Sequence, residues 1–183
     1  MSFDNIRAVS CFDSPLGMIW LAASEQGLCG LWFDGQKHQP SIAESLIADS
    51  HPILRSAQDQ VLAYFAGEQQ SFDLPLDLRA GTSFQQSVWQ SMLEIEHGQV
   101  QSYAKLSHRI GRPKASRAVG AAVGRNPISI IVPCHRVLAT RGALQGYAGG
   151  LERKRALLAI EARAQRISEE DPGQSLHTHP SDA

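Results

Sequence analysis

The sequence predicts a chain of two parts, a small antiparallel sheet with helices followed by a mostly helical part that contains a helix-turn-helix. The first third alternates strand-like stretches with turn sequences, whereas the second half contains short amphipathic segments separated by glycines. The net charge also changes sign, from −6 over residues 1–80 (four Lys/Arg, ten Asp/Glu) to +9 over residues 81–166 (thirteen and four). We therefore expect domains at 1–80 and 81–166, followed by a polar, acidic tail at 167–183 that we expect to be disordered.

Three strands are expected in the first part, over residues 7–12, 18–23 and 28–33. The stretches between them, Asp13-Ser-Pro-Leu-Gly17 and Glu25-Gln-Gly27, are both good turn sequences. This pattern predicts a β-meander.

A helix and an extended segment are expected to complete the first part. The helix begins at Pro52 and should end at Gly67, with a packing face that repeats every four residues: Ile53, Ala57, Val61 and Phe65. Apolar residues then alternate over 72–78, which predicts an extended chain, and Pro75 restricts it to an edge strand or a linker. Nothing in this acidic region looks catalytic, so we interpret it as a scaffold.

The basic part should contain four helices. The first carries an apolar face (Phe84, Val88, Trp89, Met92) and ends near Gly98. Ser102 can cap a second helix over 103–110, and Pro113 suits the first turn of a third over 114–124. Two short helices joined by a glycine-containing turn are typical of a helix-turn-helix. In the last helix, over 151–164, we expect Leu151, Leu158 and Ala162 to pack and the Arg153-Lys154-Arg155 run to be solvated.

Cysteine content and hydropathy exclude several classes of protein. No apolar run approaches a membrane span, and the N-terminus lacks the basic and apolar regions of a signal peptide. The cysteines Cys11, Cys29 and Cys134 are odd in number and have no CxxC spacing, which argues against a disulfide framework and a thiolate zinc site. This usage fits a reducing cytoplasm.

The charge pattern predicts a polyanionic partner. Between Glu96 and Glu152 there is no acidic residue, but there are eight basic ones: Lys105, Arg109, Arg112, Lys114, Arg117, Arg125, Arg136 and Arg141. Nucleic acid is the obvious partner for such a segment, although a merely solvated basic face is the alternative. The third helix also has few large side chains, so its backbone could approach either a DNA groove or another helix closely.

Residues 130–137, Ile-Ile-Val-Pro-Cys-His-Arg-Val, carry the main chemical signal. The β-branched run over 128–132 predicts a short buried strand that ends at Pro133. Cys134 and His135 are adjacent and Arg136 adds a fixed charge, a setting that lowers a thiol pKa and activates a nucleophile. A buried structural cysteine is the alternative. Glu161 is the only acid in the basic half that could orient His135.

Together these motifs resemble those of the methylated-DNA–protein-cysteine methyltransferases, the 6-O-alkylguanine DNA repair proteins. Pro133-Cys-His-Arg-Val137 is similar to the family's active-site motif, and Gly124-Arg-Asn-Pro127 is similar to the segment before it. Arg117-Ala-Val-Gly120 resembles the recognition helix and Ser102-Tyr103 its helix start, while Tyr147-Ala-Gly-Gly150 with Lys154 and Glu161 resembles the closing segment. The resemblance covers about residues 6–163.

The resemblance implies a ribonuclease H-like α/β domain followed by a winged-helix-like domain with a helix-turn-helix. It implies a DNA repair protein that extrudes an alkylated guanine from duplex DNA and moves the alkyl group to Cys134. Because water does not readily displace a thioether, the protein would be consumed in one turnover. The partner implied is double-stranded DNA that contains 6-O-alkylguanine, with 4-O-alkylthymine as a second candidate lesion. A monomer with no membrane contact and no cofactor is expected.

Residue roles also follow from the resemblance. His135 would accept the thiol proton through a bridging water, Glu161 would orient His135, and Tyr103 would push on the target phosphate and donate to guanine N3. Arg117 would fill the vacated stack. The implied DNA contacts are Tyr103, Ala115, Ser116, Arg117, Ala118, Ala121 and Arg125, and the implied substrate pocket is Asn126, Val137, Tyr147 and Ala148. Some relatives hold a structural zinc, but the matching positions Asn5, Ser24 and Cys29 offer one plausible ligand, so no metal is expected.

Two other function classes compete. An alkylated-DNA sensor or a helix-turn-helix regulator would bind DNA without transfer, but sensors that resemble this family lack the motif cysteine. A cysteine hydrolase would use Cys134, His135 and Glu161 as a triad. Residues adjacent in sequence do not easily form the direct Cys–His bond that such enzymes need.

Overall fold

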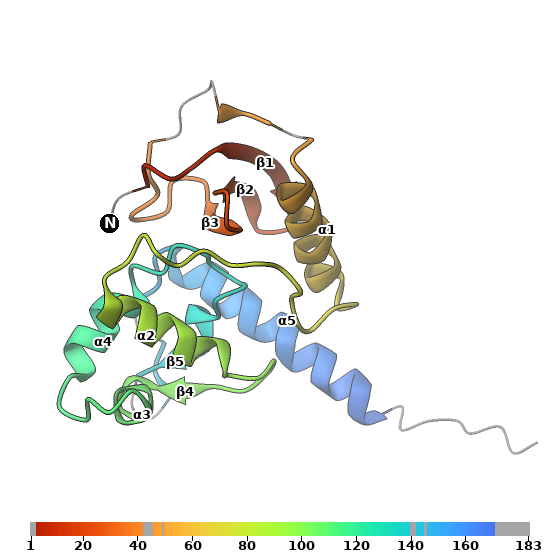
Figure 1. Cartoon of the computed structure of the whole chain (residues 1–183). Helices are drawn as coiled ribbons and strands as arrows, with labels where there is room; N and C mark the ends of the chain where they lie inside the picture. The colour runs from red at the N-terminus through yellow and green to blue at the C-terminus, as the bar shows by residue number, and fades with distance from the viewer. Residues whose placement is uncertain (1–2, 42–45, 49, 140–141, 145, 171–183) are drawn as a thin grey trace, which may run out of the picture.

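The computed structural model describes residues 3–41, 46–48, 50–139, 142–144 and 146–170. In Figure 1 the three-stranded sheet and α1 form one side of the molecule, α2, α3 and α4 form the other, and α5 runs between them. The elements in chain order are β1 (Ala8–Ser14), β2 (Gly17–Ala23), β3 (Leu28–Phe33), α1 (Pro52–Ala66), α2 (Ser83–Leu93), β4 (Gln101–Ser102), α3 (Tyr103–Arg109), α4 (Ser116–Val123), the 3-10 turn η2 (Cys134–Arg136), β5 (Val137–Leu138) and α5 (Leu151–Glu170). None of the helices in these ranges is long and apolar enough to cross a membrane.

The predicted β-meander is confirmed. The strands pair in the order β1-β2-β3, both pairs antiparallel, and Ser14 faces Gly17 across the first turn. Helix α1 covers the sheet with a buried stripe of Leu54, Ala57, Val61 and Tyr64. All four predicted packing residues contact the core, but Ile53 and Phe65 are only half-buried. Leu54 and Tyr64 are the fully buried ends of the stripe, because a strict four-residue repeat drifts around a helix of 3.6 residues per turn.

The segment after α1 is extended, as predicted. It runs beside the start of β3, where the Leu28 amide donates to Pro75 O and the Asp77 amide donates to Leu28 O, both at 2.8 Å. Asp77 also accepts hydrogen bonds from Asn5 (3.0 Å) and Ser24 (2.6 Å). Asn5 and Ser24, two of the three positions considered above for a metal, are therefore hydrogen-bonded to the Asp77 carboxylate.

The helix-turn-helix consists of α3 and α4. Ser102 caps α3 as predicted, because its hydroxyl accepts from the Lys105 amide at 3.1 Å. The predicted start of the next helix at residue 114 was wrong. Pro113 and Lys114 lie in a turn that the Ala115 amide closes on Arg112 O at 2.9 Å, an arrangement that favours proline at the second turn position.

The predicted strand over residues 128–132 was wrong, although the segment is buried. Only Ile128 forms a β-bridge, to Leu31, and Ile130 takes a left-handed backbone with φ 69°. The Leu31 amide donates to Pro127 O and the Ser129 amide donates to Leu31 O, both at 2.9 Å. The β-branched residues are thus explained by burial of a loop beneath β3, and this loop joins the two halves of the molecule.

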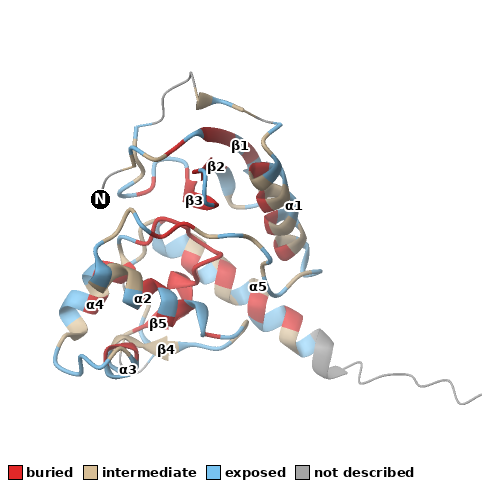
Figure 2. Ribbon diagram, viewed as in Figure 1, coloured by how far each residue is buried: buried red, intermediate tan, exposed pale blue. Residues whose placement is uncertain are grey.

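Helix α5 differs most from its prediction. It continues to Glu170, so the disorder predicted for 167–170 was wrong, and residues 171–183 lie outside the described ranges. Its buried positions are Lys154, Leu157, Glu161 and Ala164 in place of the three expected packing residues (Figure 2). Two of these four are charged, so apolar periodicity could not find the stripe.

Candidate active site

Cys134 lies at the start of η2 and lines a cavity of about 660 Å³. Tyr103 reaches this cavity because β4 pairs with β5, which places the start of α3 beside the segment that follows Cys134. The other lining residues include Gly120, Val123 and Gly124 from the α4 region, Gly146, Tyr147, Ala148 and Gly149 from the closing loop, and Gly35, Gln36, Lys37 and His38 from the N-terminal part. The thiol therefore faces a space to which both halves contribute.

The buried thiol is held by Asn126. Its Nδ2 donates to Cys134 Sγ at 3.1 Å and to Val132 O at 2.7 Å, while its Oδ1 accepts from the Ile128 amide at 3.0 Å. Burial raises the pKa of Cys134, and the Asn126 hydrogen bond and the charge of Lys154 oppose this. The expectation that His135 and Arg136 lower the thiol pKa was wrong, because both side chains bind Glu161 instead. The resting state is a neutral thiol.

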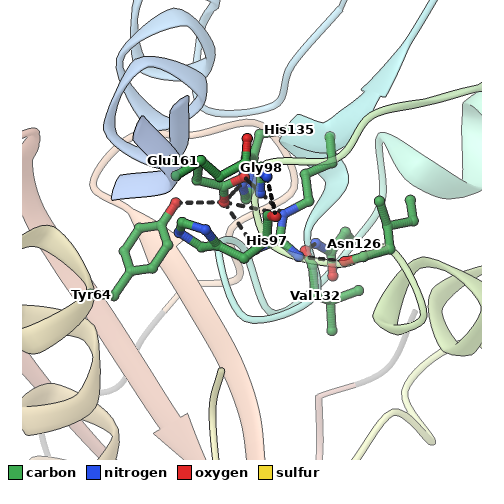
Figure 3. A network of polar contacts seen from close by, with 10 residues as sticks. Tyr64, His97, Gly98, Asn126, Val132, His135 and Glu161 are labelled. Atoms are coloured by element: carbon green, nitrogen blue, oxygen red, sulfur yellow. Dashed lines mark hydrogen bonds and ion pairs between the residues drawn. The ribbon is translucent and has the colours of Figure 1, made fainter. Parts of the chain in front are cut away.

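The Glu161 carboxylate is the centre of a buried polar network (Figure 3). Its Oε1 lies 2.7 Å from His135 Nε2 and accepts from Arg136 Nη2 and Tyr64 Oη, both at 2.9 Å. Its Oε2 accepts from Arg136 Nε and the Gly98 amide, both at 3.0 Å. Burial alone would raise the pKa of Glu161, but the hydrogen bonds and charges of His135 and Arg136 outweigh it and lower the pKa. Glu161 is therefore an ionised acceptor.

His135 is a neutral imidazole in this network. Burial lowers its pKa, the charges of Arg136 and Lys154 add to this, and together they outweigh the raising effect of Glu161. Since an ionised carboxylate only accepts hydrogen bonds, Nε2 carries the proton and Nδ1 is the basic nitrogen. Within the described ranges Nδ1 has no hydrogen-bond partner. The imidazole is thus oriented to accept a proton at Nδ1, on the side away from Glu161.

Lys154 is a site residue that the sequence reasoning placed in solvent. Its side chain is fully buried, and its Nζ donates to Val137 O at 2.7 Å and to Gly146 O at 3.5 Å. The ammonium thereby joins β5 to the closing loop of the cavity, and burial lowers its pKa. Its spacing from Leu157 and Glu161, three and seven residues, is the sequence signal that could have placed it on the buried stripe.

The predicted pocket residues have two different positions. Tyr147 and Ala148 line the cavity, whereas Asn126 and Val137 lie behind it. Asn126 donates a hydrogen bond to the thiol, and the backbone carbonyl of Val137 accepts one from Lys154. The N-terminal part supports the Tyr147 loop, because the Lys37 amide donates to Ala148 O at 3.2 Å.

Arg153 ties the same loop to the sheet, although the sequence placed it in solvent. Its guanidinium donates to Leu16 O at 2.9 Å and to Gly149 O at 3.0 Å, and it lies 4.6 Å from the centre of the Phe33 ring.

Four of the seven predicted DNA-contact residues lie on α4, Ala115 and Arg125 flank this helix, and Tyr103 begins α3. Arg117, Ala118, Ala121 and Arg125 are exposed, while Ala115 and Ser116 are half-buried. A second hollow of about 520 Å³ adjoins the cavity and is lined by Tyr103, Ala104, Ser116, Arg117, Gly120, Ala139 and Gly146. Of the eight basic residues, Lys105, Arg109, Arg112, Lys114, Arg117 and Arg125 are exposed, Arg136 is buried, and Arg141 lies outside the described ranges. A slim helix flanked by cations thus borders the opening to the thiol.

Comparison with known proteins agrees with this arrangement. Residues 9–78 match the family model for the ribonuclease-like domain of 6-O-methylguanine DNA methyltransferase, and residues 83–163 match the model for its DNA binding domain. The chain belongs to this family. The methylated-DNA–protein-cysteine methyltransferase of Methanosarcina acetivorans is 47% identical over 150 residues, which are 82% of this chain and 95% of the relative. That of Mycobacterium tuberculosis is 48% identical over 149 residues, covering 81% and 88%.

Solved structures of relatives have the same fold. The crystal structure of Mycobacterium tuberculosis OGT in complex with DNA has a TM-score of 0.77 and 44% sequence identity, covering 86% of this chain and 94% of that one. The 6-O-methylguanine-DNA methyltransferase of Pyrococcus kodakaraensis has a TM-score of 0.58 and 26% identity, covering 84% and 98%. The predicted fold class, a ribonuclease H-like α/β domain followed by a helical DNA-binding domain, is confirmed.

Proposed function

We propose that this protein repairs DNA by moving an alkyl group from O6 of guanine to Sγ of Cys134, once per molecule. The observation that carries the proposal is the Cys134 thiol in a cavity of about 660 Å³ beside a slim cationic helix, with the His135–Glu161 pair behind it. Membership of the methyltransferase family supports the same chemistry.

The transfer is a single displacement at carbon. The sulfur forms a bond to the alkyl carbon while the bond from that carbon to guanine O6 breaks, and the bonding electrons pass to the guanine ring. We propose that the thiol proton goes to His135 Nδ1 through a bridging water, and that Glu161 stabilises the imidazolium that forms. The departing guanine gains these electrons, so a hydrogen bond or a proton must stabilise its negative charge. Tyr103 can provide it, because burial and the nearby Cys134 raise the pKa of its hydroxyl and keep it protonated.

DNA binding follows from the surface around the cavity. A guanine stacked in a duplex cannot reach a buried thiol, so the base must be extruded. We propose that α4 lies against the duplex, that Arg117 takes the place of the extruded base, and that the cations of α3 and α4 bind phosphates. Ala118 and Ala121 on the exposed face allow the backbone to approach closely.

The competing functions fit less well. A sensor without chemistry has no need of a nucleophile that Asn126 positions and Lys154 activates. A hydrolase triad requires a direct bond between the histidine and the thiol, and within the described ranges no hydrogen bond joins the His135 ring to Cys134 Sγ.

We further propose that the domain boundary lies near residue 80, between the extended segment and α2, which Thr82 and Gln85 cap. We propose that the protein acts as a monomer, since one chain supplies every residue of the site, and in the cytoplasm, since all three cysteines are free.

The test is a titration with a duplex that carries one 6-O-methylguanine per molecule. Repair should stop at one guanine per protein even when DNA is in excess, and Cys134→Ser should repair none. Cys11→Ser is the matched control, since Cys11 is an exposed thiol on β1, and it should match the unaltered chain. Repair of many guanines per protein, or repair by Cys134→Ser, would contradict the proposal.

A further inference from the structure

One residue of the N-terminal part reaches the proton-transfer groups. Tyr64 lies on α1, is fully buried, and donates its hydroxyl to Glu161 Oε1 at 2.9 Å. The same oxygen lies 2.7 Å from His135 Nε2. Figure 3 shows Tyr64 and His135 meeting the carboxylate from different elements. The region that the sequence suggested was only a scaffold therefore touches the acid that orients the base.

We propose that Tyr64 is a positioning residue for alkyl transfer, which controls from the N-terminal domain how strongly the His135–Glu161 pair holds the thiol proton. The inference rests on the proposed function. Tyr64 acts through Glu161 and touches neither the thiol nor the substrate cavity.

The physical basis is competition for one carboxylate oxygen. Each donor to Oε1 withdraws part of its negative charge, so the Tyr64 hydroxyl reduces the charge that stabilises a protonated His135. Without this donor, the imidazole would hold a proton up to a higher pH. A histidine that is already protonated cannot accept the proton of Cys134, so the donor keeps the base in its reactive form.

The hydrogen bond of the Tyr64 hydroxyl can be removed without changing how the Tyr64 ring packs. The Tyr64 ring lies edge-on to Phe65 (5.7 Å between centroids) and His97 (6.0 Å), and tilted against Phe72 (5.6 Å). Arg136 and the Gly98 amide still bind the carboxylate when the hydroxyl is absent, so Glu161 stays paired. Removal of the oxygen therefore tests the hydrogen bond while the aromatic packing remains.

Several other ionisable groups face the pair, and a pH experiment must consider them. They are Arg136 and Cys134 from η2, Lys154 from α5, and His97 from the segment between α2 and β4. Burial lowers the pKa of Lys154 and raises the pKa of Cys134. Burial lowers the pKa of His97 as it does that of His135, so a His97→Gln background separates the contributions of the two histidines.

The experiment compares single-turnover rate constants of methyl transfer for Tyr64→Phe and the unaltered chain across the range in which histidine titrates. At low pH the rate should fall as His135 becomes protonated, which gives the rate profile an acid limb. In Tyr64→Phe this limb should lie about half to one unit higher in pH, since one pH unit is a tenfold change in proton affinity. Phe72→Leu is the matched control, because it alters the packing of the same ring and leaves the hydroxyl in place. Its limb should coincide with that of the unaltered chain, and the Tyr64→Phe shift should persist in the His97→Gln background.

A constant drop in rate with an unmoved limb would indicate a merely structural role and would overturn the inference. An unaltered chain without an acid limb would also overturn it. If the unaltered chain transfers no methyl group at all, the proposed function fails first, so the two failures are distinguishable. If Tyr64→Phe does not fold, the hydroxyl proton of Tyr64 in the unaltered chain gives a second readout. Its NMR signal should move as His135 titrates, and a fixed signal would overturn the inference.

Discussion

At the scale of single residues, two buried charges on one helix approach Cys134 and His135. Glu161 lies 2.7 Å from the imidazole, and Lys154 donates to the backbone carbonyls of Val137 and Gly146. Their effects are complementary. Glu161 stabilises the proton after it leaves the thiol, and Lys154 favours the thiolate that forms. Neither charge reaches solvent, so their effects are weakly screened.

Lys154→Met should slow methyl transfer about tenfold or more, because the thiolate loses its nearby cation and one pKa unit is a tenfold change in ionisation. The alkaline limb of thiol reactivity should also move to higher pH. Both effects can be measured by rapid-quench transfer assays and by thiol alkylation at several pH values. Arg155→Met is the control, since Arg155 is exposed at the next position and pairs with Glu152. A Lys154→Met rate equal to that of the unaltered chain would contradict the role of Lys154.

The buried pair also sets how stability depends on pH. The pKa of His135 is lowered, so below about 6.5 the unfolded chain binds a proton that the folded chain does not. Stability should therefore decrease as the pH falls below that value. The pKa of Glu161 is lowered too, so protonation of Glu161 in the unfolded chain adds a further loss below about 4.3. Chemical denaturation at several pH values measures the trend. His108→Gln, at an exposed position, should leave the slope unchanged, and a flat profile through the histidine range would refute the assignment.

At the scale of elements, α4 has one buried and one exposed side. Its buried side packs through Val119, Ala122 and Val123, and Trp89 of α2 donates its indole N–H to Ala122 O at 2.9 Å. Its exposed side presents Arg117 between small residues. The buried side thus packs α4 against the rest of the protein, while the long side chain of Arg117 projects beside the cavity opening.

Arg117→Ala should reduce repair of duplex DNA about tenfold or more and leave the reaction with free 6-O-methylguanine nearly unchanged. The reason is that a stacking contact of this kind stabilises by roughly 1–3 kcal/mol and exists only when a base leaves a duplex. Parallel rate measurements on the two substrates give the comparison. Arg163→Ala, an exposed change on α5, should affect neither. Equal losses on both substrates would count against base extrusion by Arg117.

Elements also show where sequence reasoning works and where it fails. The strands of the meander and the capped start of α3 were predictable, because turn sequences and Ser102 act locally. The loop over 128–132 was not, since its conformation depends on the Asn126 side chain and on hydrogen bonds to Leu31, about a hundred residues away. The buried stripe of α5 was missed because Lys154 and Glu161 are buried only through partners on other elements. Cys134, His135 and Glu161 were recognisable from chemistry, whereas Tyr64 carried no such signal.

At the scale of the whole molecule, the larger of two hydrophobic clusters spans both halves, while a smaller one, which includes Trp32, lies in the N-terminal part. Buried residues of the sheet and α1 belong to the same cluster as those of α2, α4 and the Cys134 loop. Polar contacts cross the same boundary, from Tyr64 to Glu161 and from Arg153 to Leu16. The site therefore depends on both halves, although the family models divide the chain between residues 78 and 83.

Because the larger cluster spans both halves, their described parts should unfold together in one cooperative transition. Tryptophan fluorescence reports on both, through Trp32 of β3 and Trp89 of α2, which are both buried. Trp20 of β2 is the third tryptophan, so the two signals are separated in a Trp20→Phe background that carries either Trp32→Phe or Trp89→Phe. The denaturation midpoints should coincide after correction for each substitution. Distinct midpoints for the two probes would show that the halves are independent.

The central claim is that Cys134 becomes the alkyl acceptor. The most direct measurement is peptide mass spectrometry of the protein after reaction with a duplex that contains one 6-O-methylguanine. One added methyl group on the peptide that contains Cys134, with Cys11 and Cys29 unmodified, is the result that the structure predicts. Restored guanine with an unmodified Cys134, or tight binding of the lesion without any transfer, would contradict it.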